Sequence, residues 1–165
     1  MTEVLALKYA EAFPPDREHF FVSHDPHDAP HPISYFLWLI RGESGIVVVD
    51  TGFGERAAAT RNRTLLRHPV EALASVGVDA NTVHSVILTH LHYDHAGTIA
   101  SFPNATFFVQ KRELAYATGP AMRHALCRKP FDIENMIELL RALDERRGQV
   151  VDNDRALGGG ISLHI

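Results

Sequence analysis

The stretch that decides the fold reads Val86-Ile87-Leu88-Thr89-His90-Leu91-His92-Tyr93-Asp94-His95-Ala96-Gly97. Its first three residues form an apolar run that is typical of a buried strand. The residues that follow place three histidines and one aspartate within six positions. Imidazole and carboxylate groups are ligands of zinc and similar divalent ions. Because α/β folds place their chemistry at the carboxyl ends of strands, the stretch predicts a metal-binding loop.

The spacing within this loop favours convergence of the ligands. Alternate side chains of an extended segment share a face, so His90 and His92 are expected to point at one ion, and Asp94 follows with the same parity. His95 joins them only through a turn, which Gly97 makes possible. The four side chains could serve one ion or be divided between two, and two ions about 3.5–4 Å apart polarise a carbonyl or phosphoryl oxygen together. A polar loop that holds these ligands by chance is the weaker interpretation.

Composition limits the classes of protein to which the chain can belong. Its 165 residues, 45% hydrophobic and 22% charged, predict one globular domain over residues 1–165. The net charge of −4 argues against a nucleic-acid partner. No run approaches the roughly 20 apolar residues of a membrane span, and no signal-peptide pattern is visible. Cys127 is the single cysteine, so it forms no internal disulfide and is expected to pack as a small apolar residue. We therefore expect a cytoplasmic protein without a membrane partner.

Hydrophobic patterning predicts strands that first pair as a hairpin and then alternate with helices. The predicted strands are residues 4–9, 20–22, 33–40, 46–49, 83–88, 106–109, 149–151 and 161–165. The predicted helices are residues 55–66, 69–75, 96–100, 111–117 and an amphipathic helix that begins after an N-cap at Asp132 and ends at Gly148. This order indicates an α/β or α+β layered domain.

Asp50 ends the buried run 46–49 and is followed by Thr51, Gly52, Phe53 and Gly54. In one interpretation its carboxylate satisfies the amides of a tight turn. In the other it lies beneath the metal loop and orients a ligand, as carboxylates around metal sites do. The residues alone leave both open.

The remaining histidines carry no comparable pattern. Residues 24–32 hold three histidines and two aspartates among three prolines, which predicts a solvated surface loop because prolines spread such ligands along the chain. Surface or structural positions are predicted for the others, which are His19, His68, His84, His124 and His164.

Several stretches together resemble one family, the metallo-β-lactamase superfamily, and within it the N-acyl homoserine lactonase-like group. The histidine loop and the segment 47–52 resemble the superfamily. The segments 25–28, 35–42, 50–54 and 109–119 resemble the lactonase-like group. The resemblance implies a four-layer αββα sandwich, of which this chain supplies roughly the first αβ half, and a hydrolase with two metal ions, usually zinc.

The resemblance also implies roles for individual residues. His90 and His92 would bind the first ion, and Asp94 and His95 the second, with Asp94 also the predicted catalytic residue. Asp50 would support the loop, and two aromatic side chains, Phe53 and Tyr93, would line the substrate site. The implied reaction is opening of an N-acyl homoserine lactone by metal-bound hydroxide, which ends a quorum signal. The alternatives are another hydrolase of the superfamily, such as a glyoxalase II-type thioesterase or an arylesterase, and a non-catalytic fragment that keeps half of the site.

The sequence departs from the family pattern after the strand predicted at 161–165. The pattern requires a further histidine, a bridging aspartate and a final histidine, and we predict a C-terminally incomplete domain. His164 is not a substitute, since it is predicted to lie inside the strand. Two protein ligands for each ion fall short of the three that catalytic zinc sites have, so zinc occupancy is expected to be weak or partial. A sheet without its opposing sheet predicts an exposed apolar face and self-association through it.

Overall fold

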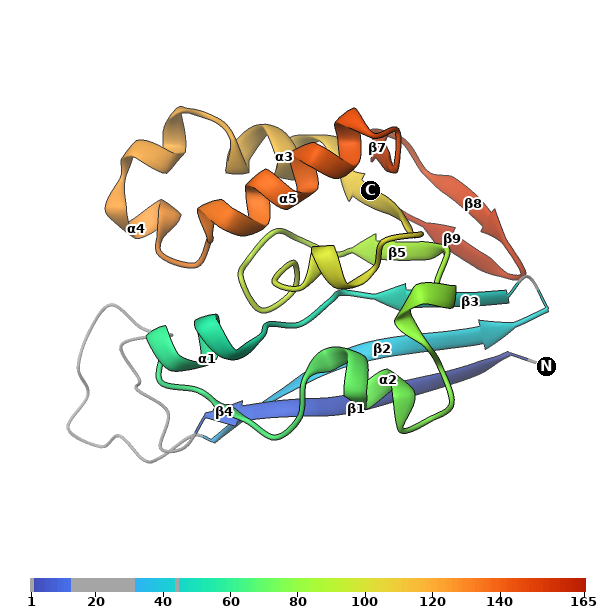
Figure 1. Ribbon diagram of the computed structural model, residues 1–165. Coiled ribbons are helices and arrows are strands. Elements are labelled where there is room, and N and C mark those ends of the chain that lie inside the picture. The colour runs from blue at the N-terminus through green and yellow to red at the C-terminus, as the bar shows by residue number, and fades with distance from the viewer. Residues whose placement is uncertain (1, 13–31, 44) are drawn as a thin grey trace.

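The computed structural model describes residues 2–12, 32–43 and 45–165 (Figure 1). The predicted strand at 20–22 and the predicted surface loop at 24–32 lie outside the described residues, apart from residue 32. The strands are β1 Glu3–Ala12, β2 Ile33–Gly42, β3 Gly45–Val49, β4 Thr64–Leu65, β5 Ser85–Leu88, β6 Thr106–Gln110, β7 Gly148–Val151, β8 Arg155–Gly158 and β9 Ile161–Leu163. The α-helices are α1 Glu55–Thr60, α2 Pro69–Ala74, α3 Lys111–Ala117, α4 Ala125–Arg128 and α5 Ile133–Asp144. Short 3-10 turns are η2 Ala80–Thr82, η3 Ile99–Ser101 and η4 Pro120–Arg123.

Seven strands form one mixed sheet in the order β4-β1-β2-β3-β5-β6-β7. β1, β2 and β3 pair antiparallel, as the predicted hairpin requires, and β3, β5, β6 and β7 pair in parallel. The carboxyl ends of β3 and β5 therefore meet at one edge of the sheet, where Asp50 and the histidine loop begin. The predicted α/β architecture is confirmed.

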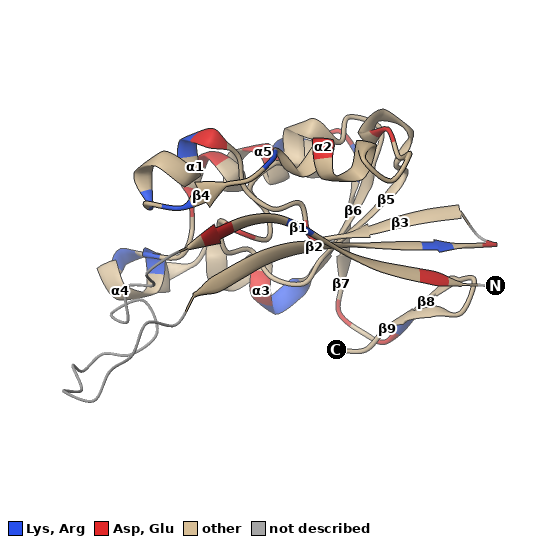
Figure 2. Ribbon diagram, turned by 90° about the horizontal axis from the view of Figure 1, so that it is seen from below, with Lys and Arg blue, Asp and Glu red and all other residues tan. Residues whose placement is uncertain are grey.

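Helices α1, α2 and α5 lie on one side of the sheet, and the β8–β9 hairpin lies on the other (Figure 2). Alternation along the strands turns Leu37, Leu39 and Val48 toward the helices, where they are fully buried. Leu73 and Leu139 meet them in the core. Complete burial of one such side chain contributes about 1.5–3 kcal/mol relative to exposure. The main hydrophobic core therefore lies between the sheet and these helices.

The opposite face of the sheet carries large apolar side chains that remain partly exposed. Val4 is 58% exposed, Trp38 45% and Phe36 39%. Across the strands, Trp38 lies opposite Val49 and extends this apolar row into the parallel part of the sheet. The β8–β9 hairpin contacts the sheet at β6, where the Arg155 guanidinium lies 5.7 Å from the centre of the Phe108 ring. The apolar surface expected from the sequence is thus present on the β1–β2–β3 side.

Some element boundaries differ from those predicted. The helix predicted at 55–66 ends at Thr60, and the next residues turn back to place the two-residue strand β4 beside β1. The helix predicted at 96–100 is only the 3-10 turn η3. Strand β8 was not predicted, and β9 ends at Leu163, so His164 lies just past the strand and not inside it.

The end of α5 shows why one boundary prediction was wrong. The helix ends at Asp144, and Arg146 adopts the left-handed backbone conformation, with φ 61°, that a glycine at a helix end often takes. Gly148 instead begins β7, where a Cβ atom would collide with the Leu143 side chain. Close packing, and not helix termination, accounts for this glycine. In the described residues, no helix combines the length and hydropathy needed to cross a membrane.

Candidate metal centre

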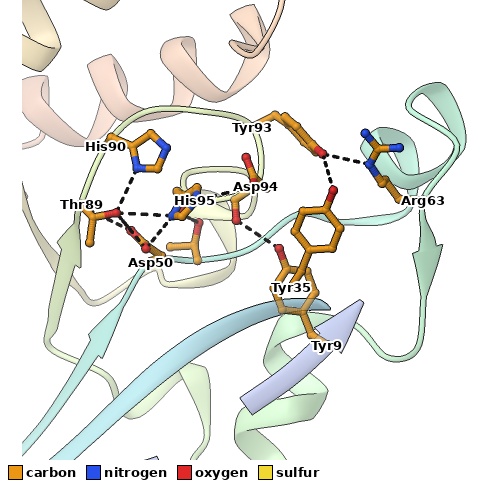
Figure 3. Close-up of polar contacts among 10 residues, drawn as sticks. Tyr9, Tyr35, Asp50, Arg63, Thr89, His90, Tyr93, Asp94 and His95 are labelled. Atoms are coloured by element: carbon orange, nitrogen blue, oxygen red, sulfur yellow. Dashed lines mark hydrogen bonds and ion pairs between the residues drawn. The ribbon is translucent and has the colours of Figure 1, made fainter. Parts of the chain in front are cut away.

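Asp50 connects the two strand ends on which the site is built (Figure 3). Its side chain is 5% exposed, and its backbone has φ 63°, a conformation that aspartate tolerates better than most residues. Its Oδ1 accepts hydrogen bonds from the Thr89 amide at 2.8 Å and from the Thr89 hydroxyl at 2.9 Å. Its Oδ2 lies 2.7 Å from Nδ1 of His95. The carboxylate therefore contacts the first residue of the histidine loop and a candidate ligand, as the second interpretation requires.

The contact between Asp50 and His95 selects the tautomer of the imidazole. A carboxylate only accepts, so Nδ1 of His95 carries the proton and donates it to Asp50. In the neutral ring, the lone pair then resides on Nε2. This Nε2 lies 3.5 Å from Oδ2 of Asp94. In the neutral ring this lone pair faces the other carboxylate of the loop, whose negative charge favours a proton or a cation between them.

The loop brings all four predicted ligands to one place. The ring centres of His90 and His95 are 3.8 Å apart, and those of His90 and His92 are 4.4 Å apart. The turn that His95 requires is present, because the amides of His95 and Ala96 both donate to the carbonyl of His92, at 3.0 Å. His90 and His92, which share a face, and His95, which follows a turn, are therefore neighbours in space.

Three imidazoles and one carboxylate fit a divalent metal by the chemistry of their donor atoms. Across residues 2–12, 32–43 and 45–165, however, no group of three or more histidine, cysteine, aspartate or glutamate side chains is arranged to hold an ion. The loop thus supplies ligands of the right type close together, without forming a finished cage.

The backbone of the loop is held from several distant elements. The Tyr9 hydroxyl donates to the carbonyl of Asp94 at 3.1 Å, and the Thr51 amide donates to the carbonyl of His95 at 2.7 Å. Further bonds run from the amides of Leu91, Tyr93 and Gly97 to Glu113 Oε1, Pro130 O and Gly52 O, at 2.9, 2.8 and 2.8 Å. Tyr9, Glu113 and Pro130 were not identified from the sequence. No local pattern marks them, since each contact joins segments that are far apart in the chain.

The two predicted substrate-lining residues are both packed. Phe53 is fully buried, and its ring centre lies 5.1 Å from those of Tyr9 and Tyr35. The Tyr93 hydroxyl lies 3.3 Å from the Tyr35 hydroxyl and accepts a hydrogen bond from Nε of Arg63 at 3.3 Å (Figure 3). Burial raises the pKa of Tyr35, aided by its hydrogen bond to Tyr93. These contacts support a packing role for both residues, and contact with substrate stays a prediction.

His164 lies exposed at the end of the β8–β9 hairpin, where it lines a pocket that also includes Thr89 at the start of the histidine loop. Its Nδ1 is 3.0 Å from Asp154 Oδ2 and its Nε2 is 2.9 Å from the Ser162 hydroxyl. The hydrogen bond between Asp154 and His164 lowers the pKa of Asp154. The half-buried Cys127 lies on α4. Among the described residues, neither side chain joins the histidine cluster.

Burial and neighbouring charges shift the pKa values of the three loop histidines in different directions. Burial, followed by the neighbouring imidazoles, lowers the pKa of His90 below its ordinary 6.5, and burial also lowers that of His92. Burial opposes protonation of His95 too, but the hydrogen bond and charge of Asp50, together with Asp94, outweigh it and raise the pKa of His95. At neutral pH, His90 and His92 are therefore free bases with lone pairs available to a metal.

We expect NMR titration of the metal-free protein to show His95 gaining its proton at a higher pH than His90 and His92. The raised pKa of His95 stabilises the fold below about pH 6.5, and this contribution is lost as pH rises through the folded-state pKa. The lowered pKa values act oppositely, because folding then becomes less favourable as pH falls below about 6.5. An Asp50→Asn variant should lower the pKa of His95. Titration of His95 below both other rings would contradict the assignment.

Comparison with known proteins gives consistent matches. The profile of the metallo-beta-lactamase superfamily matches residues 15–163. The chain is 47% identical over 51 residues to N-acyl homoserine lactonase AttM of Azorhizobium caulinodans, which covers 31% of this chain and 19% of that protein. It is 32% identical over 101 residues to the probable metallo-hydrolase Rv2300c of Mycobacterium tuberculosis, covering 53% of this chain and 33% of the relative.

Solved structures show the same fold. A crystal structure of a quorum-quenching N-acyl homoserine lactone lactonase superposes with a TM-score of 0.71 at 22% identity, covering 99% of this chain and 61% of that one. A probable metal-dependent hydrolase from Staphylococcus aureus gives a TM-score of 0.71 at 15% identity, covering 98% and 62%. The chain spans less than two thirds of the length of both structures.

Proposed function

The chain belongs to the metallo-beta-lactamase superfamily, and from this we propose that it forms part of a metal-dependent hydrolase that opens the ring of N-acyl homoserine lactones. The observation that carries the proposal is the loop from His90 to His95, whose ligands are gathered around an imidazole that Asp50 holds in one tautomer. Lactonases among the relatives and the solved structures support the choice of substrate class.

We assign the ligands as the loop order suggests. His90 and His92 would hold one ion, and Asp94 and His95 a second, with zinc the metal that this donor set favours. Such ions, when bound, lower the pKa of water to about 7 and polarise a carbonyl oxygen. Asp50 would keep Nε2 of His95 directed at the metal by holding the proton on Nδ1.

Asp94 is our candidate for the proton transfer that ring opening requires. Water adds to the lactone carbonyl carbon, the bond from that carbon to the ring oxygen breaks, and the ring oxygen leaves as a hydroxyl. The Asp94 carboxylate, with a side chain 21% exposed and next to Nε2 of His95, would take the proton from water and deliver it to the ring oxygen. The product is an N-acyl homoserine: its carboxyl group keeps the hydroxyl of water, the ring oxygen keeps the other hydrogen, and ionisation of the new acid releases one proton to solvent.

The test is hydrolysis of N-hexanoyl homoserine lactone, followed by acid release, with zinc, cobalt or manganese supplied to the complete protein. We expect metal-dependent ring opening that His92→Ala abolishes. Absence of turnover with all three metals would overturn the proposal. Faster cleavage of a thioester or aryl ester than of any lactone would favour another hydrolase of the superfamily.

Metal analysis separates turnover from simple binding. Two protein ligands for each ion predict weak zinc binding by residues 1–165, because catalytic zinc sites usually have three protein ligands. Loosely held zinc together with no hydrolysis would support a non-catalytic module that keeps only these four ligands. Two tightly held ions would argue against that alternative.

We also propose that the chain of 165 residues self-associates through the apolar face around Val4, Phe36 and Trp38. Covering this face removes apolar surface from water, at about 25 cal/mol for each Å². Light scattering should show a mass that rises with concentration, and Trp38→Lys should reduce it. Leu126→Lys is the matched control, because Leu126 is 73% exposed on α4, away from the sheet. A monomer at all concentrations would contradict the proposal.

A further inference from the structure

Glu113 makes an unusual contact from the first turn of α3. Its Oε1 accepts a hydrogen bond from the amide of Leu91 at 2.9 Å, across 22 positions in the sequence. Leu91 stands between His90 and His92, and its own side chain is fully buried. The peptide that joins two candidate ligands is therefore bonded to a carboxylate from another element.

A second helix of the same chain shows what a glutamate at this position ordinarily does. In α2, Glu71 is the third helical residue, and its Oε2 accepts from the amide of the N-cap residue His68 at 3.0 Å, which closes a capping box. In α3, Glu113 holds the same third position after its N-cap, Gln110. Its carboxylate does not close such a box but reaches out to Leu91.

The position of Glu113 is fixed by the N-cap of α3. Its amide donates to Oε1 of Gln110 at 2.9 Å, which caps the helix and fixes the first turn. β6 and β5 are parallel neighbours, so the start of α3 lies beside the start of the histidine loop. Because the carboxylate binds the amide of Leu91, its negative charge lies next to the peptide that joins His90 and His92.

We propose that Glu113 is a positioning residue for the metal loop: it fixes the peptide between His90 and His92 and places a negative charge beside that peptide. A carboxylate in this position binds the amide more strongly than a neutral acceptor would. It also offsets the positive charge of a divalent ion held by the two imidazoles, without contacting the ion. The inference rests on the proposed metal loop, but its structural part concerns a hydrogen bond that exists without metal.

Two substitutions separate the hydrogen bond from the charge. Glu113→Gln keeps an oxygen acceptor for the Leu91 amide and removes the charge, whereas Glu113→Ala removes both. Glu71→Ala is the matched control, because it removes a glutamate from the same helical position without touching the loop. Circular dichroism first establishes that each variant folds.

The readouts are hydrogen exchange at the Leu91 amide in metal-free protein and zinc affinity measured by competition with a chromophoric chelator. Glu113→Ala should accelerate Leu91 exchange and weaken zinc binding by about 10–100-fold, the range found for residues that support metal ligands. Glu113→Gln should keep Leu91 protected and weaken zinc binding less. Glu71→Ala should leave both unchanged.

The outcomes distinguish this inference from the proposed function. Unchanged Leu91 exchange in Glu113→Ala would overturn the positioning role whether or not zinc binds. Unchanged zinc affinity in Glu113→Gln would overturn the role of the charge. If the wild-type protein bound no zinc, the proposed function would fail and the charge role with it, while the exchange measurement would still decide the structural part.

Discussion

Replacing Asp50 with alanine is expected to lower the free energy of unfolding by roughly 3 kcal/mol, because it removes the partner of several part-buried donors at once. The Thr89 amide, the Thr89 hydroxyl and Nδ1 of His95 all donate to this one carboxylate. Alanine also fits poorly at φ 63°, which costs roughly another 1 kcal/mol. Urea unfolding measures the loss.

Asp50→Asn separates the charge from the shape. Asparagine tolerates the left-handed backbone and keeps one oxygen acceptor, but its NH₂ group would face a donor on Thr89 or His95. We expect His95 to lose its fixed tautomer and zinc affinity to fall by about 10–100-fold, with a smaller stability loss than in Asp50→Ala.

Asp152→Asn serves as the control for both Asp50 variants. Asp152 is exposed and forms a 3.3 Å ion pair with Lys111 at the surface, where such pairs contribute about 0–1 kcal/mol. If Asp50→Ala unfolded at the same urea concentration as the wild-type protein and bound zinc equally well, the carboxylate would not be what holds the loop.

The local part of this site was predictable from sequence. A short apolar run followed by His90, His92, Asp94 and His95 determines ligand type, parity and the need for a turn, and all of these depend on neighbours along the chain. The same holds for Asp50, where the end of a buried strand and the glycines that follow indicate a polar turn. The structure adds that one oxygen of this carboxylate binds the Thr89 amide at the start of the loop, while the other contacts His95.

The long-range part was not predictable, for a physical reason. Tyr9 reaches Asp94 across 85 positions, and only the pairing of β1 with β2 and of β3 with β5 brings them together. Periodicity reports which face of a strand is buried but not which strand lies beside it. Glu113 is ambiguous in the same way, because a glutamate at that helical position is consistent with an ordinary capping box.

Boundary errors had a different origin. Arg146, and not Gly148, takes the left-handed conformation after α5, and position 148 requires a glycine because a Cβ atom there would collide with Leu143. A two-residue strand such as β4 has no periodicity to detect, and it exists because Leu65 and Thr64 pair with β1. For β4, pairing with a strand more than 50 positions away therefore overrode the local helical preference.

Gly97→Ala should be at least as damaging as the loss of Asp50, although it adds one methyl group and requires no unusual backbone. Gly97 is not among the glycines with left-handed φ, so alanine is conformationally allowed. A Cβ atom there, however, would lie 2.9 Å from the Cα of Phe53 and still closer to the carbonyl oxygens of Tyr93 and Gly52. All three obstacles are backbone atoms, which cannot rotate away as a side chain can.

The new methyl group would push apart the two segments that form the site. The Gly97 amide donates to the carbonyl of Gly52 at 2.8 Å, which ties the end of the histidine loop to the segment after Asp50. We expect the free energy of unfolding to fall by at least about 3 kcal/mol, with weaker zinc binding in whatever folds.

Gly42→Ala isolates this steric effect, because it adds the same methyl group in ordinary contact, 3.5 Å from the Thr2 hydroxyl. It should change stability by less than about 1 kcal/mol, since alanine is slightly preferred to glycine within a strand. Urea unfolding of both variants decides the matter. Equal stabilities would mean that the loop and the segment 50–54 can separate by the width of a methyl group, and the close contact between them would then not be what gathers the ligands.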